Sequence, residues 1–97
     1  MITIKKKQNL ITVEGHADYS KKEDIVCASV SSIMYTTVNA CLRFNASSIA
    51  YKDSGEMVSI TILDETLETK VLIVNMLSLF KELASKYPNN IKIESEE

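Results

Sequence analysis

The sequence predicts an α+β fold in which a mostly antiparallel sheet of four or five strands is accompanied by two long helices. Short stretches of alternating apolar and polar residues occur in pairs along the chain, and this pattern is typical of half-buried strands joined as hairpins. Two longer segments, 25–44 and 67–87, have the length and the flanking polar residues of helices. The expected order is therefore ββαββαβ.

The strands are assigned from their alternation. Residues 1–6 follow an edge-type pattern, and residues 10–14 resume it after a polar turn, so the two form a hairpin. Residues 49–51 and 58–63 form a second hairpin. A short last strand covers residues 91–93, and we expect the acidic tail to be frayed.

The two helices begin at residues that cap free backbone N–H groups. Asp24 is a strong candidate for the cap of helix 25–44, because its carboxylate accepts hydrogen bonds at that position. Residues 64–66 offer a cap for helix 67–87, which ends at Pro88. The apolar stripe expected on this second helix consists of Val74, Leu77, Phe80, Leu83, Ala84 and Tyr87.

Length and composition indicate one ordinary globular domain over residues 1–97, with 45% apolar and 25% charged residues. A net charge of −2 and few aromatic residues give no reason to expect nucleic-acid binding. The pattern suggests neither a membrane span nor a secretory signal, so we expect a cytoplasmic protein. With two cysteines and one histidine, we expect free thiols and neither a zinc site nor a cofactor.

Cys27, His16 and Asp24 form the arrangement that carries chemistry. Cys27 lies three positions after the expected cap, so it belongs to the first helical turn, where free N–H groups and the helix dipole stabilise an anion. The thiolate is the reactive form of cysteine. His16 lies where a strand ends, and the loop that follows is long enough to bring its imidazole back to the thiol.

This spacing alone is a weak signal, because a cysteine in a helix is more often a small buried residue and a loop histidine is more often solvated. A thiol-redox role is disfavoured, since there is no C-x-x-C pair and Cys41 lies about 21 Å along the same helix. We interpret Cys41 as a core residue. A metal enzyme is disfavoured further, because no ligand cluster accompanies the single histidine.

Two motifs resemble the ribosomal-processing cysteine proteases (the Prp family). That family has a G-H-A element, a short loop and a helix start of the form D-[IL]-V-C-A-x-V-[ST]. The loop here lacks the glycine that usually precedes the aspartate in the family. The matching residues are Gly15-His16-Ala17 and Asp24-Ile25-Val26-Cys27-Ala28-Ser29-Val30-Ser31.

The resemblance implies a cysteine endopeptidase that removes an N-terminal extension from a large-subunit ribosomal protein, and it implies a homodimer. The nucleophile carries over to Cys27 and the base to His16. Asp24 and Ser31 are supporting residues; Asp24 either caps the helix or orients the imidazole. The loop is expected to form a mobile lid over the substrate, with contributions from Gly15, Ala17, Lys21 and Lys22. The alternative is a non-catalytic ribosome-associated binding module.

Overall fold

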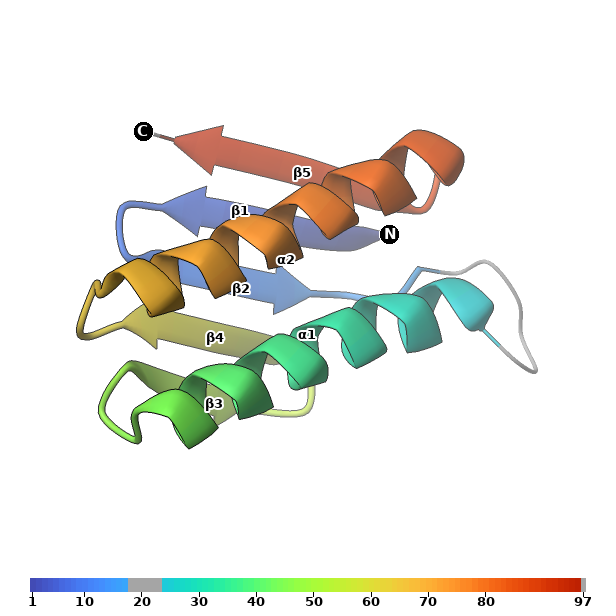
Figure 1. Ribbon diagram of the computed structural model, residues 1–97. Helices are drawn as coiled ribbons and strands as arrows, with labels where there is room; N and C mark the ends of the chain where they lie inside the picture. The colour runs from blue at the N-terminus through green and yellow to red at the C-terminus, as the bar shows by residue number, and fades with distance from the viewer. Residues whose placement is uncertain (18–23, 97) are drawn as a thin grey trace.

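The computed structural model describes residues 1–17 and 24–96 and shows two layers, a five-stranded sheet and a pair of helices. Both helices lie on the same face of the sheet (Figure 1). The predicted order of elements is confirmed. The elements are β1 (Ile2–Lys7), β2 (Leu10–Glu14), α1 (Ile25–Phe44), β3 (Ile49–Asp53), β4 (Met57–Ile62), α2 (Leu67–Lys86) and β5 (Ile91–Glu96).

The strands are arranged in the order β3-β4-β2-β1-β5. The two predicted hairpins, β1–β2 and β3–β4, are confirmed, and β2 pairs with β4 to join them. These three pairings are antiparallel, whereas β5 pairs with β1 in the parallel direction. The class predicted from the sequence, a mostly antiparallel sheet with two long helices, is therefore confirmed.

The core lies between the sheet and the two helices. Successive side chains of a strand point to opposite faces, so alternate residues of the central strands are directed at the helix layer. Ile4, Ile11 and Ile60 are completely buried there, as is Phe80 of α2. The opposite face carries polar side chains such as that of Lys5, which is why the strands alternate in sequence.

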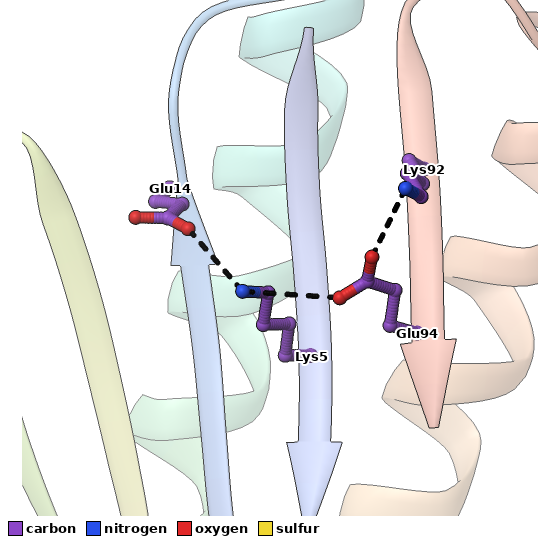
Figure 2. A network of polar contacts seen from close by, with 4 residues as sticks. All are labelled: Lys5, Glu14, Lys92 and Glu94. Atoms are coloured by element: carbon purple, nitrogen blue, oxygen red, sulfur yellow. Dashed lines mark ion pairs between the residues drawn. The ribbon is translucent and has the colours of Figure 1, made fainter. Parts of the chain in front are cut away.

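Two details of the sheet differ from the sequence-based expectations. β1 lies inside the sheet, between β2 and β5, so its assignment as an edge strand is wrong. The acidic tail is also not frayed as far as Glu96, because it continues β5 beside the lysines of β1. Glu94 is paired with Lys5 in the strand register, and Lys92 also contacts it (Figure 2). The alternation of apolar and polar residues within a strand cannot reveal that β5 pairs with β1 at the other end of the chain.

The helix boundaries agree closely with the prediction, but the buried stripe of α2 differs from it. α2 is capped by Thr66, whose hydroxyl accepts a hydrogen bond from the N–H of Thr69. Val74 is 56% exposed, whereas Ile73 and Met76 are buried. Including Val74 in the apolar stripe was therefore an error. The buried face of this helix is rotated toward Ile73 because α2 packs against both α1 and β5.

α1 is long and apolar enough to cross a membrane by length and composition, although the sequence pattern suggested no membrane span. Core helices of soluble proteins have the same character. Here α1 directs Val26, Val30, Met34, Val38 and Cys41 into the core shared with the sheet. The packing of these residues therefore accounts for part of the apolar composition of α1.

Candidate active site

The candidate site forms where β2 ends and α1 begins. Asp24 precedes the helix with extended backbone angles, and one of its carboxylate oxygens accepts hydrogen bonds from two N–H groups of the first turn. The distances are 3.1 Å to the nitrogen of Val26 and 3.0 Å to that of Cys27. The predicted cap is thus confirmed as a structural feature. It fixes the helical turn that carries the Cys27 thiol.

The Cys27 thiol accepts a hydrogen bond from the backbone. The N–H of Ala17 lies 3.2 Å from Sγ, and the two residues are separated by ten positions in the sequence. Ala17 is 1% exposed, so this contact is formed at the inner side of the site. An N–H donor aimed at sulfur stabilises negative charge on it, because a hydrogen bond to an ionised acceptor is stronger than one to a neutral acceptor.

His16 and Cys27 line one pocket of about 180 Å³, and Ser31 lines it one helical turn farther along α1. Cys27 is half-buried, whereas His16 is exposed. His16 also lines a neighbouring hollow together with Glu14 and Glu56. The imidazole therefore lies at the junction of two depressions, where it is open to solvent and to an extended ligand.

Gly15 gives the chain the conformation that it needs immediately before His16. Its φ angle is +90°, a value that residues with a side chain rarely adopt. A Cβ atom at this position would collide with the carbonyl oxygen of Met1. The backbone thus passes the N-terminus of β1 at a separation that only glycine allows, and this close approach places His16 at the rim of the pocket.

The far wall of the pocket comes from α1 and from the turn between β3 and β4. Tyr35 lies two turns beyond Cys27, and its hydroxyl donates to a carboxylate oxygen of Asp53 at 3.3 Å. The ring of Tyr35 meets that of Tyr51 edge-on, with centroids 6.3 Å apart. These contacts tie the helix to the hairpin, and Tyr35 and Asp53 both line the pocket.

The structure brings together Gly15, His16, Cys27 and Ser31, all of which the sequence singled out. Ala17 is placed differently from the expectation of a mobile lid, because it is buried and hydrogen-bonded through both its N–H and its carbonyl. Lys21 and Lys22, the other expected lid residues, lie outside the described residues. The N–H of Cys27 donates to Asp24, so a substrate oxygen that is to be bound by this N–H has to displace that carboxylate.

Cys41 is buried more deeply than Cys27. It is completely buried, and desolvation by that burial raises the pKa of its thiol. Both cysteines are free thiols. The interpretation of Cys41 as a core residue is therefore confirmed, and Cys27 is the thiol that reaches a pocket.

Sequence reasoning missed several contributors to the site, among them Tyr35 and Asn90. Tyr35 was detectable, since it lies eight residues after Cys27 and so within the same broad stripe of the helix. Asn90 was not detectable, because it appeared only as part of a polar stretch after Pro88. Its side-chain amide donates to the carbonyl of Ala17 at 2.9 Å across 73 positions of sequence.

A half-buried thiol in a capped first helical turn, with an imidazole on the same pocket, is the arrangement of a cysteine hydrolase. The comparison with known families agrees with this class. The model of the family described as cysteine protease Prp matches residues 1–92, and the chain belongs to that family.

Curated relatives and solved structures of the same family cover nearly the whole chain. The ribosomal processing cysteine protease Prp of Mycoplasma genitalium is 32% identical over 99% of this chain and 97% of its own length. The corresponding protein of Staphylococcus aureus is 29% identical over 86% of this chain and 82% of its own length. A crystal structure of the S. aureus protease with a covalently linked product peptide superposes with a TM-score of 0.85 at 27% identity, covering 99% of this chain and 100% of that one.

Proposed function

We propose that this protein is a cysteine endopeptidase that removes the N-terminal extension of a large-subunit ribosomal protein during ribosome maturation. In this proposal Cys27 is the nucleophile and His16 is its acid–base partner. The observation that carries it is the shared pocket, which is lined both by the only histidine of the sequence and by Cys27, whose thiol accepts a backbone hydrogen bond.

Family membership and the relatives support the substrate class. The relatives are named ribosomal processing proteases, and the S. aureus structure holds a product peptide covalently linked to the protein. A covalently held peptide is what a nucleophilic mechanism through sulfur leads to. The pocket of this chain continues into the neighbouring hollow past His16, which offers an extended peptide a path along both.

The proposed reaction begins when the Cys27 thiolate attacks the carbonyl carbon of the scissile peptide bond and forms a C–S bond. The tetrahedral intermediate collapses with cleavage of the C–N bond, and His16 as imidazolium gives its proton to the departing amine. Water then attacks the thioester while His16 takes one of its protons. The C–S bond breaks, the carboxylic product leaves, and the thiolate–imidazolium pair is restored.

Three further groups assist Cys27 in this proposal. The N–H of Ala17 stabilises the thiolate before attack, and Asp24 holds the first turn in place. When the substrate oxygen binds at the helix start, it accepts a hydrogen bond from the N–H of Cys27, and the carboxylate of Asp24 gives up its bond to that N–H. Ser31 lines the pocket next to the thiol and contacts the substrate or the site water. Whether Asp24 also orients His16 is decided by the Asp24→Asn variant described below.

The direct test is cleavage of the host's extended ribosomal protein by wild type, Cys27→Ala and His16→Ala. Cys27→Ala should abolish cleavage, and His16→Ala should reduce it at least a hundredfold, since general acid–base catalysis contributes about 10²–10⁴. Cys41→Ala is the matched control and should cleave normally. Circular dichroism should show all three variants folded.

The outcomes separate the peptidase from its main rival. Cleavage by Cys27→Ala would remove the thiol from the mechanism. If wild type binds the extended protein without cleaving it, the chain is a ribosome-associated binding module. Full activity of His16→Ala would leave Cys27 as the nucleophile but require a different residue to protonate the departing amine.

We further propose that the protein is a cytoplasmic homodimer of a single domain that binds no nucleic acid directly. The net charge of −2 supports the last point, because a phosphate backbone is bound by an excess of positive charge. Leu67, Val71 and Val74 are exposed along one side of α2, which favours coverage by a second copy. Sedimentation equilibrium measures this directly, and a monomer at micromolar concentration would contradict it.

A further inference from the structure

Ala17 is the residue through which a distant part of the chain reaches the thiol. Its N–H donates to Sγ of Cys27, and its carbonyl accepts from the side-chain amide of Asn90 at 2.9 Å. The residue is thus held from both sides, by the start of α1 and by the connection between α2 and β5. His16 immediately precedes Ala17, so the same two hydrogen bonds also fix the backbone on the C-terminal side of His16.

Asn90 is itself firmly placed, and its backbone accounts for this. Its N–H donates to the carbonyl of Tyr87 at 3.0 Å, at the end of α2. Its carbonyl accepts from the N–H of Ile2 at 2.9 Å, at the start of β1. Neither bond involves the side chain. The amide of Asn90 is therefore available as a fixed donor, and replacing the side chain leaves the backbone anchors in place.

The side chain of Asn90 serves no element of secondary structure. It reaches from the end of α2 to the carbonyl of Ala17, and it is absent from the lining of both depressions beside His16. A half-buried amide that bonds a buried carbonyl is costly to lose, because that carbonyl is then left without its partner. Loss of the bond from Asn90 would release the carbonyl of Ala17 and so weaken the hydrogen bond from the N–H of Ala17 to Sγ of Cys27.

We propose that Asn90 is a positioning residue for the reaction of Cys27, which holds Ala17 so that its N–H points at the sulfur. The proposal rests on the proposed role of Cys27 as the nucleophile. Asn90 contacts neither substrate nor sulfur and acts only through Ala17. Its loss should therefore slow the chemical step and leave substrate binding unchanged.

The test compares wild type, Asn90→Ala, Asn90→Asp and Asn89→Ala. Asn90→Asp keeps the size of the side chain but removes the donor, since a carboxylate accepts hydrogen bonds only. Asn89 is the matched control, because it is the same residue one position earlier and is exposed. The readouts are kcat and KM for a peptide spanning the cleavage junction, the alkylation rate of Cys27 at pH 7, and the melting temperature.

Both Asn90 variants should show kcat and Cys27 alkylation lowered about five- to tenfold, with KM within about twofold of wild type. Asn89→Ala should match wild type in all three readouts. Unchanged kcat in a folded Asn90 variant overturns the inference. So does a parallel rise in KM with a large fall in melting temperature, which indicates a merely structural role.

Failure of the underlying function gives a different pattern. If wild type itself neither cleaves the peptide nor alkylates at Cys27 faster than at Cys41, the peptidase assignment fails before any variant is compared. A reactive wild-type Cys27 with no difference among the variants rejects the role of Asn90 alone. Because Asn90→Asp retains the volume of the side chain, it decides the question even if Asn90→Ala folds poorly.

Discussion

The backbone N–H of Ala17 donates a hydrogen bond to Sγ of Cys27 at 3.2 Å, so the residue after His16 is joined directly to the thiol. This hydrogen bond joins the segment that follows β2 to the first turn of α1. The sulfur consequently accepts a main-chain hydrogen bond in the first turn of a helix. The arrangement leads to predictions about reactivity, about the cap and about the glycine that precedes His16.

Alkylation should separate the two cysteines. Cys27 lies in a pocket at the positive end of a helix dipole, whereas Cys41 is completely buried and its thiol pKa is raised by desolvation. With iodoacetamide at pH 7, Cys27 should be modified at least a hundredfold faster, because opening of the core limits reaction at Cys41. Mass spectrometry of the digested protein measures both sites. Equal, slow modification of the two thiols in the folded protein would count against an activated Cys27.

Asp24 can be tested as a cap separately from any role toward His16. Asp24→Asn should change the free energy of unfolding by less than about 0.5 kcal/mol, because asparagine caps almost as well, while Asp24→Ala should cost about 1 kcal/mol. Urea unfolding measures both values. We expect Asp24→Asn to retain most of the cleavage activity. A severe loss of turnover at unchanged stability would instead assign the carboxylate to orienting the imidazole.

Gly15 and Gly55 form a matched pair for testing the close approach beside His16. Their φ angles are +90° and +91°, so an alanine at either position costs about 1–2 kcal/mol in backbone strain. Only at Gly15 would the new Cβ also strike the carbonyl oxygen of Met1. Gly15→Ala should therefore be less stable than Gly55→Ala by at least about 1 kcal/mol. Equal losses of stability in urea unfolding would show that the contact with Met1 is easily relieved.

The sequence was sufficient for the local features of the site and insufficient for its long-range ones. Asp24 and the helix start were predictable because a cap acts over three residues. The interior position of β1 and the bond from Asn90 to Ala17 depend on the return of β5 to the N-terminus. Alternating hydrophobicity carries no information about which strands become neighbours. The dyad was suggested by a motif, since spacing alone leaves His16 free to lie far from Cys27.

Glu94 gives the sheet a pH-dependent contribution to stability. The hydrogen bond and charge of Lys92, and then the charge of Lys5, hold the pKa of this carboxyl below its ordinary value of 4.5 (Figure 2). A lowered pKa in the folded state means that the ionised form stabilises the fold above that value. The contribution is lost as the pH falls through the lowered pKa.

Glu94→Gln should consequently melt slightly below wild type at pH 7, and the difference should shrink and vanish as the pH falls through the lowered pKa of Glu94. The effect should also shrink at 1 M salt, because all three side chains are solvated and their attraction is screened. Ser95→Ala, on the neighbouring exposed position, is the control and should show no pH-dependent difference. A gap between Glu94→Gln and wild type that widens toward acid pH would mean that protonated Glu94 stabilises the sheet, contrary to the direction of its pKa shift.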